Sequence, residues 1–323
     1  MPLSIDIPRS ILDIHWPTIS SDRKAPCMSL QLTESELATA REIVVRALAE
    51  DLRDVGDITS LSVLPPDIEA TVEIVSRKHG RLSGIPIAQI VFEEMDASVR
   101  WNSKLADGDE LKPGAVIASI TGSVRSLLSG ERTALNFLTH LSGVASLTNQ
   151  FVKAVEGTNA VILDTRKTLP GYRDIQKYAV RCGGGTNHRR GLFDAILIKD
   201  NHLAFLDEKD REIPEVLTAA RKYSDENGKV IVQVEVDTLE QLALALPASP
   251  DIVLLDNMKP DTLRKAVEMR EETNKSVLLE ASGGVNMETV RGIAESGVDR
   301  ISIGALTHSA PTLDLGFDWP KKK

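Results

Sequence analysis

From residue 160 to residue 303 the chain alternates short apolar runs with segments of helical periodicity, and this alternation restricts the fold more than any other feature. The apolar runs have the length of buried strands and cover residues 160–164, 195–198, 230–236, 251–255, 276–280 and 300–303. Helices are predicted between them over residues 214–223, 239–246, 261–272 and 287–295. Repeated βα units with short links predict a parallel sheet, closed into an incomplete TIM-like α/β barrel of six or seven strands.

The chain before residue 125 has another pattern, which predicts a separate α+β sandwich domain. Thr33 and Glu36 have the capping-box spacing of a helix start, and a second helical segment covers residues 86–95. A loop is expected at residues 54–59, where glycine and aspartate gather. Strands are expected at residues 70–75, 99–101 and 115–120.

A long helical region from residue 125 to about residue 155 joins the two patterns, and we place the domain boundary inside it. The first domain then covers residues 29–140 and the barrel covers residues 141–308. Residues 1–28 carry several prolines and acidic residues but no long apolar run. We therefore expect an N-terminal extension there, and neither a secretory signal nor a transit peptide.

Composition excludes a protein that spans membranes or depends on disulfides. Hydrophobic residues make up 42% of the chain and charged residues 26%, as in soluble globular proteins. No apolar run approaches the roughly 18 residues of a membrane helix. The only cysteines, Cys27 and Cys182, form neither a CxxC nor a metal-binding pattern. We therefore expect a cytoplasmic protein in a reducing compartment, without a membrane partner.

Cations follow the first two apolar runs of the barrel region. Arg166 and Lys167 come after the first run, and Lys199 after the second. Residues just past strand ends are where parallel α/β folds bind their ligands. The whole chain has a net charge of −9, yet residues 164–202 contain eight Lys or Arg and four Asp or Glu. This local positive charge predicts a pocket for a small anionic ligand, and not a nucleic-acid partner, which needs a broad basic surface.

The segment between these two runs holds further candidates. Arg173, Lys177 and Arg181 recur at helical spacing, and we expect them on a solvated helix face. His188 and Arg189 follow a run of three glycines, which allows the backbone to fold back over the strand ends. The alternative for these two residues is a flexible surface loop.

Two acidic residues, Glu235 and Asp256, follow the next two runs. We interpret them as groups that hold Mg²⁺ or that face a developing cation on a substrate. They are the only anions expected at the strand ends, and an inward carboxylate among apolar neighbours is costly unless it is paired. The alternative is that both form structural ion pairs with the lysines.

Glycine-rich loops follow the last two runs, at Ser282-Gly283-Gly284 and at Gly304-Ala305. In α/β barrels such loops bind phosphate through backbone N–H groups, and a helix N-terminus is expected directly after the first loop. A plain tight turn has the same sequence signal. Planar Arg side chains suit carboxylates, so the complete set predicts a ligand with several carboxylates and phosphates.

Short motifs spread over residues 30–316 make the chain similar to one family. They include Gly56-Asp-Ile-Thr59, Glu131-Arg-Thr133, Leu141-Ser-Gly143, Leu163-Asp-Thr-Arg-Lys-Thr168, Gly183-Gly-Gly-Thr-Asn-His-Arg189, Leu197-Ile-Lys-Asp-Asn-His202, Val234-Glu-Val236, Leu254-Leu-Asp-Asn257, Ser282-Gly-Gly284 and Ile303-Gly-Ala-Leu-Thr-His308. In this order they resemble quinolinate phosphoribosyltransferase, also called nicotinate-nucleotide diphosphorylase (carboxylating). Residues 1–28 lie outside the resemblance.

The resemblance implies a reaction and an assembly. Quinolinate and phosphoribosyl diphosphate (PRPP), with Mg²⁺, are converted to nicotinate mononucleotide, CO2 and diphosphate, the entry to de novo NAD synthesis. The implied fold is a sandwich domain and an incomplete barrel, with residues 309–323 returning to the first domain. The implied partner is a second copy of the chain, in a homodimer or a hexamer of dimers.

The resemblance also implies which residues bind quinolinate. Arg166, His188 and Arg189 line the quinolinate pocket in this reading. Arg132 reaches from one subunit into the site of its neighbour and contacts quinolinate there. Lys167 and Lys199 lie between the quinolinate carboxylates and the diphosphate.

Phosphoribose transfer involves a second group of residues. Glu235 and Asp256 are implied to hold Mg²⁺ and the ribose hydroxyls, and with Lys167 and Lys199 they are the expected catalytic residues. The 5′-phosphate is expected in the glycine-rich loops, at Ser282, Gly283, Gly284 and Gly304.

The sequence leaves three other functions open. One is a transferase of the same fold that acts on another pyridine carboxylate, such as nicotinate. Another is an aldolase that forms a Schiff base at Lys199. The third is a regulator that binds a phosphate ligand on an inactive barrel.

Overall fold

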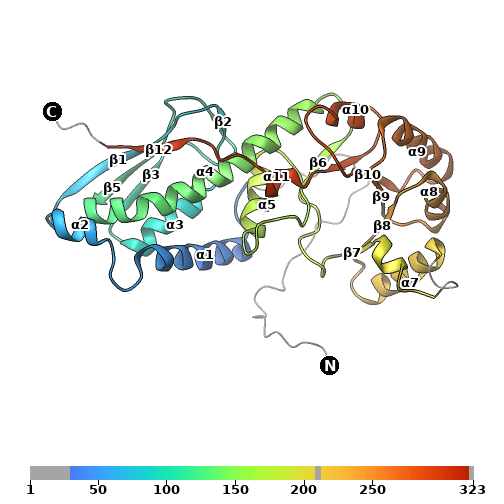
Figure 1. Ribbon diagram of the computed structural model, residues 1–323, viewed down its shortest axis with the longest axis horizontal. Helices are drawn as coiled ribbons and strands as arrows, with labels where there is room; N and C mark the ends of the chain where they lie inside the picture. The colour runs from blue at the N-terminus through green and yellow to red at the C-terminus, as the bar shows by residue number, and fades with distance from the viewer. Residues whose placement is uncertain (1–29, 208–211, 320–323) are drawn as a thin grey trace.

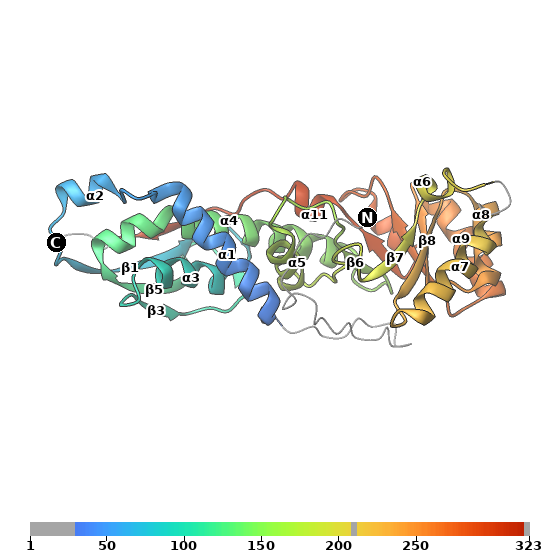
Figure 2. The ribbon, with the colours of Figure 1, turned by 90° about the horizontal axis from the view of Figure 1, so that it is seen from below.

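The computed structural model describes residues 30–207 and 212–319, so the predicted N-terminal extension lies outside the described residues. The molecule is elongated, with an antiparallel sheet at one end and a parallel sheet at the other (Figures 1 and 2). Helix α4 (Val124–Ala154) runs between the two ends. Among the described residues, no helix is long and apolar enough to cross a membrane.

The N-terminal domain is built on a four-stranded antiparallel sheet with the strand order β12-β1-β5-β3. Its strands are β1 (Glu69–Ser76), β3 (Arg100–Ser103), β5 (Val116–Ser123) and β12 (Leu315–Asp318). Helices α1 (Glu34–Leu52), α3 (Ile85–Met95) and α4 pack beside it, and β2 (Gly80–Arg81) pairs with β4 (Glu110–Leu111). Phe92 of α3 stacks on Phe317 of β12, with ring centroids 6.2 Å apart, so the C-terminal strand belongs to this core.

The start of α1 confirms the predicted capping box. The Thr33 hydroxyl accepts a hydrogen bond from the backbone N–H of Glu36, and the Glu36 carboxylate accepts one from the N–H of Thr33. The predicted loop at residues 54–59 is wrong in its second half, because helix α2 (Ile58–Val63) begins there. Asp57 is the N-cap of α2, and its carboxylate accepts the N–H groups of Thr59 and Ser60, both at 3.1 Å.

The C-terminal domain contains six parallel strands in the order β6-β11-β10-β9-β8-β7, which confirms the incomplete α/β barrel. These strands are β6 (Val161–Leu163), β7 (Ala195–Ile198), β8 (Ile231–Val236), β9 (Ile252–Asp256), β10 (Leu278–Ser282) and β11 (Arg300–Ser302). The helices along them are α5 (Arg173–Cys182), α6 (Asp200–Leu203), α7 (Ile213–Glu226), α8 (Leu239–Ala245), α9 (Pro260–Thr273), α10 (Val290–Ala294) and α11 (Ala305–His308). All six predicted strands are present, with β10 two residues later than expected.

The barrel is open between β6 and β7, which are the two edges of the sheet. The chain between them, residues 164–194, forms α5 and then returns along β6. There Thr186 makes one isolated parallel bridge to Leu163. This single bridge stands where a closed barrel has a full strand pairing.

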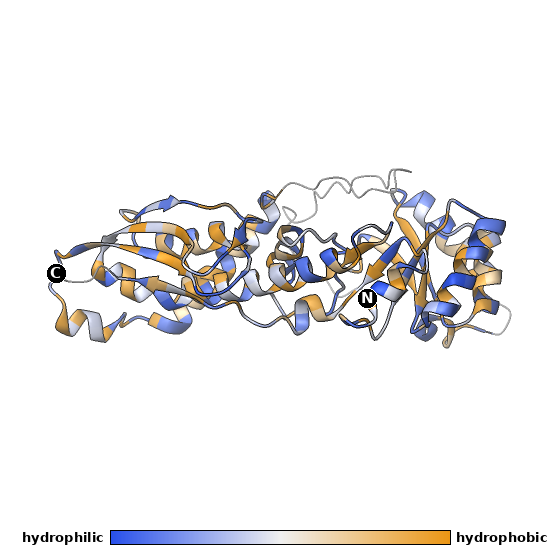
Figure 3. Ribbon diagram, turned by 90° about the horizontal axis from the view of Figure 1, so that it is seen from above, coloured by the Kyte–Doolittle hydropathy of each residue, from blue (hydrophilic) through white to orange (hydrophobic). Residues whose placement is uncertain are grey.

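The two domains share one hydrophobic core, and α4 contributes to both parts of it. Hydrophobic residues concentrate along the strands of both sheets (Figure 3). Gly143 of α4 has no Cβ, which would lie 3.0 Å from the carbonyl carbon of Pro311. It therefore lets the segment before β12 cross the helix closely. The predicted boundary at residues 140–141 falls inside the unbroken α4, and the domain division stays a prediction.

The predicted solvated face of α5 is wrong for two of its three cations. The side chain of Arg181 is buried, and both terminal nitrogens of its guanidinium donate at 2.8 Å to the carboxylate of Glu36 on α1. The side chain of Lys177 is also buried and forms an ion pair with Asp164. Helical spacing cannot reveal these partners, because Glu36 and Asp164 lie on other elements.

Candidate active site

A cavity of about 760 Å³ opens at the carboxyl ends of the barrel strands. It is lined by every predicted site residue but one: Arg166, Lys167, His188, Arg189, Lys199, Glu235, Asp256, Ser282, Gly283, Gly284 and Gly304. The exception is Arg132, which lies exposed on α4, outside the residues that line the cavity. The structure therefore brings the strand-end residues together and leaves Arg132 apart from its own pocket.

Arg166 and Arg189 make one side of the cavity strongly positive. The Nε of Arg166 is buried and has no hydrogen-bond partner among the described residues. Burial and then the neighbouring Arg166 cation lower the pKa of Arg189. Two guanidinium groups that repel each other in a partly buried site are stabilised by a bound anion.

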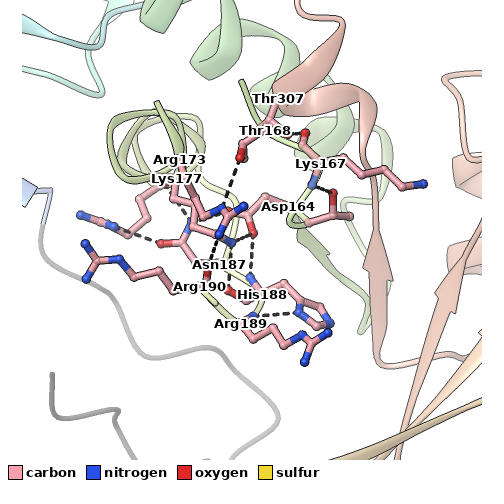
Figure 4. A network of polar contacts seen from close by, with 12 residues as sticks. Asp164, Lys167, Thr168, Arg173, Lys177, Asn187, His188, Arg189, Arg190 and Thr307 are labelled. Carbon is pink, nitrogen blue, oxygen red and sulfur yellow. Dashed lines mark hydrogen bonds and ion pairs between the residues drawn. The ribbon is translucent and has the colours of Figure 1, made fainter. Parts of the chain in front are cut away.

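Lys167, His188 and Arg189 project to the same side, away from α5 (Figure 4). The Nδ1 of His188 accepts a hydrogen bond from the backbone N–H of Arg189 at 2.7 Å. The guanidinium of Arg189 donates to the carbonyl oxygen of Ala195 at 3.0 Å, which holds it near the start of β7. The loop after the three glycines is thus an ordered wall of the cavity and not a free surface loop.

The acidic pair Glu235 and Asp256 lies on neighbouring strands, β8 and β9. Glu235 forms an ion pair with Lys199, as the structural alternative for this residue predicted. The carboxylate of Asp256 accepts a hydrogen bond from the side chain of Asn257 at 2.6 Å.

The carboxylates of Glu235 and Asp256 are the groups predicted to hold a metal ion. Among residues 30–207 and 212–319, no group of three or more His, Cys, Asp or Glu could hold an ion by itself. Two carboxylates beside a glycine-rich loop nevertheless fit Mg²⁺, which commonly keeps several waters and takes further oxygens from substrate phosphates.

Glu280 is a cavity residue that the sequence reasoning missed, and it corrects the expectation that Glu235 and Asp256 are the only anions there. Its side chain is fully buried on β10, and it accepts a hydrogen bond from the Nε of Arg300 at 3.0 Å. Its other oxygen lies 3.2 Å from the Nε2 of His188, without hydrogen-bond geometry. Burial alone would raise the pKa of Glu280, but His188 and then Arg300 outweigh burial and hold it well below its ordinary value.

A sequence signal for Glu280 existed. It is a carboxylate at the end of an apolar run, the same signal that identified Glu235. His308 of α11 was also missed, although it lines the cavity. A Cβ at Gly304 would lie 3.0 Å from the Cδ of Lys167 and 3.2 Å from the Nε2 of His308, so this glycine leaves room for both side chains.

The first glycine loop differs from the expectation in one respect. Gly283 and Gly284 have φ values of +88° and +62°, a conformation that glycine adopts easily. Helix α10 begins only at Val290, because the Asn286 side chain first accepts the N–H groups of Glu288 and Thr289 in a turn. The loop is therefore not at a helix N-terminus, and a phosphate there would depend on the loop's own N–H groups.

Comparison with known proteins agrees with this architecture. Residues 57–142 match the family model described as quinolinate phosphoribosyl transferase, N-terminal domain, and residues 144–318 match the C-terminal domain of the same family. The nicotinate-nucleotide pyrophosphorylase [carboxylating] of Mycobacterium leprae is 42% identical over 289 residues, which is 89% of this chain and 99% of the relative.

Solved structures lead to the same family. The nicotinate-nucleotide pyrophosphorylase from Francisella tularensis matches with a TM-score of 0.80 and 38% identity, covering 88% of this chain and 97% of that one. NadC from Streptococcus pyogenes matches with a TM-score of 0.82 and 36% identity, covering 91% and 100%. The chain therefore belongs to the quinolinate phosphoribosyltransferase family of enzymes.

Proposed function

We propose that this protein transfers the phosphoribosyl group of PRPP to quinolinate and releases CO2, giving nicotinate mononucleotide and diphosphate. The observation that carries the proposal is that two features lie in the same cavity. One is a set of cations without carboxylate partners in the described chain, Arg166, Lys167 and Arg189. The other is the pair of glycine loops after β10 and β11. A dicarboxylate and a sugar phosphate match these two features.

Quinolinate occupies the positive side of the cavity in this proposal. Arg166 and Arg189 bind its carboxylates, and the unpaired Nε of Arg166 is one donor available for them. His188 lies beside Arg189 and completes this wall. The pyridine nitrogen carries no proton, so it can attack the sugar carbon without a general base.

PRPP occupies the other side, with its 5′-phosphate on Ser282, Gly283, Gly284 and Gly304. Glu235 and Asp256 face the ribose, where positive charge develops in the oxocarbenium-like transition state. They would also hold Mg²⁺, whose charge helps to neutralise the departing diphosphate. Lys167 and Lys199 lie between the two substrates, and Lys199 leaves its ion pair with Glu235 to bind the diphosphate.

Decarboxylation follows on the nucleotide. Attack at the sugar makes the ring nitrogen positive, and the pyridinium then accepts the electron pair that is left when the adjacent carboxylate departs as CO2. A proton from solvent or from a cavity residue completes the ring. The protein assists this step by holding the ring in place after transfer.

The proposal includes a homodimer in the cytoplasm. Large apolar side chains gather in and around α2 and on the neighbouring part of α4, and they are exposed: Val55, Ile58, Leu61, Val63 and Leu128. Arg132 follows Leu128 by one helical turn, so it lies on the same face of α4. A second copy of the chain that covers this surface would receive Arg132 in its own cavity.

Complementation tests the shared site. Arg132→Ala and Arg166→Ala homodimers should each be nearly inactive, because every site lacks one cation. After subunit exchange, half of the dimers are mixed and one of their two sites is intact, so activity should recover to about a quarter of the wild-type value. No recovery, with exchange verified by affinity pull-down of differently tagged chains, would place Arg132 outside the neighbour's site.

The reaction itself is tested with purified protein, quinolinate, PRPP and Mg²⁺. Nicotinate mononucleotide and CO2 should form in equal amounts, and both should disappear when Mg²⁺ is chelated. Nucleotide formed from nicotinate without CO2 would instead support the alternative pyridine carboxylate. Binding of PRPP without turnover of either acid would support the inactive-barrel alternative.

A further inference from the structure

The open edge of the barrel leaves one wall of the cavity without a strand to support it. β6 pairs with β11 on one side, but on the other side it has only the bridge between Leu163 and Thr186. His188 and Arg189 follow this bridge after one intervening residue, Asn187. Backbone hydrogen bonds of a ladder therefore do not fix their position, and something else must.

A buried side chain supplies the hydrogen-bond acceptors for the residues that follow the bridge. Asp164, the residue after β6, is fully buried. One of its carboxylate oxygens accepts the backbone N–H of His188 at 2.9 Å, and the other accepts the side chain of Asn187 at 2.6 Å (Figure 4). The Asp164 carboxylate thus replaces the next ladder acceptor.

Lys177 completes the arrangement from α5. Its ammonium group forms the ion pair with Asp164 and also donates to the carbonyl oxygen of His188 at 3.0 Å. Both backbone polar groups of His188 are therefore held by one buried ion pair. Asn187 adds a link to the other domain, because its side chain accepts from Arg181, which binds Glu36 on α1.

We propose that Asp164 and Lys177 are positioning residues for the quinolinate side of the cavity. They set the backbone of His188, and through it the directions of the His188 ring and the Arg189 guanidinium, without touching the substrate themselves. Because a buried ion pair is weak evidence for net stability, the role we assign to this one is to fix the geometry of the cavity wall. This inference rests on the proposed function, since it assigns the two residues to the binding of quinolinate and not of PRPP.

The matched control is a second buried ion pair at the opposite end of the strands. Arg270 of α9 binds Asp299 at 2.8 Å, and Asp299 directly precedes β11, away from the strand ends that form the cavity. Asp299 also accepts a backbone N–H, that of Leu279, at 2.9 Å. Asp164→Asn and Asp299→Asn therefore remove comparable buried interactions, and only the first lies beside the cavity.

The experiment measures KM for each substrate, kcat and the melting temperature of both variants. Asp164→Asn should raise the KM for quinolinate on the order of 10- to 100-fold, because small displacements of binding groups have effects of this size. Its KM for PRPP should stay unchanged. Asp299→Asn should lower the melting temperature without a change in either KM.

A double variant separates positioning from folding. Asp164→Leu combined with Lys177→Met removes both charges. Its melting temperature should therefore be higher than that of Asp164→Asn, while its KM for quinolinate stays high. A wild-type KM for quinolinate in Asp164→Asn or in the double variant would overturn the inference and leave the proposed function intact. Wild-type protein that neither binds quinolinate in calorimetry nor converts it would overturn both.

Discussion

The two sides of the cavity are built in different ways. The glycine loops after β10 and β11 follow strands that are paired on both sides, so the parallel ladder fixes where they begin. The wall with His188 and Arg189 has no such ladder and depends on buried charges brought from α5 and from the end of β6. One side is positioned by the backbone, the other by side chains.

This difference teaches which parts of a site tolerate substitution. A backbone-built site depends on conformation and free space, and it is disturbed by added volume. A site built from side chains depends on charge balance, and it is disturbed when one partner is removed. Glu280 belongs to both sides, since it lies on β10 two residues before Ser282 and faces His188.

The largest expected effect is therefore on stability at Glu280. Glu280→Gln leaves Arg300, whose side chain is only 16% exposed, without its anion, and we expect the free energy of unfolding to fall by about 3–5 kcal/mol. Urea denaturation measures this change. Glu288→Gln, on the exposed turn nearby, is the control and should change little. Equal stability of the two variants would show that Glu280 does not link the two sides.

Arg166→Ala should separate the two sides in binding. Loss of a charge-assisted contact in a desolvated site should cost about 2–5 kcal/mol in kcat/KM for quinolinate. The affinity for PRPP, measured by calorimetry, should stay close to that of the wild type. Arg264→Ala on the exposed side of α9 serves as the control for loss of positive charge. Wild-type kcat/KM would remove Arg166 from the quinolinate side.

Gly304→Val should act on the opposite side. Added volume beside Lys167 should raise the KM for PRPP by a factor on the order of ten, about 1.4 kcal/mol. Gly292→Val is the matched control, because a Cβ there meets only the ring of Pro260 at 3.7 Å. An unchanged KM for PRPP would mean that the loop after β11 does not hold the phosphate.

The smallest expected effect is a pH dependence on the charge-built side. The pKa of Glu280 is lowered in the folded protein from its ordinary value of 4.5, so its contribution to stability is present above that value and is lost as pH falls below it. One such group changes the free energy of unfolding by at most about 1.4 kcal/mol per pH unit. Below pH 4.5, the free energy of unfolding should fall less steeply with decreasing pH in Glu280→Gln than in the wild type. Parallel curves would contradict the lowered pKa.

The sequence predicts the backbone-built part of the molecule better than the rest. Periodicity identifies all six barrel strands, and residues past their ends identify most of the cavity. It does not show that Lys177 and Arg181 turn inward, because their partners Asp164 and Glu36 come from other elements. The sequence does not predict helix α2 for a local reason. Aspartate is favoured both in turns and at helix N-caps, so Asp57 does not distinguish a turn from a helix start.

Helix α4 has a consequence for the angle between the two domains. Its 31 residues extend over about 46 Å. The domains are joined a second time where the segment before β12 crosses the helix at Gly143. One residue inserted between Arg132 and Gly143 would turn the two ends of the helix by about 100° relative to each other. Strand β12 could then no longer pair with β1 in register. The number of residues between Arg132 and Gly143 therefore sets the direction in which Arg132 projects from the helix relative to the barrel.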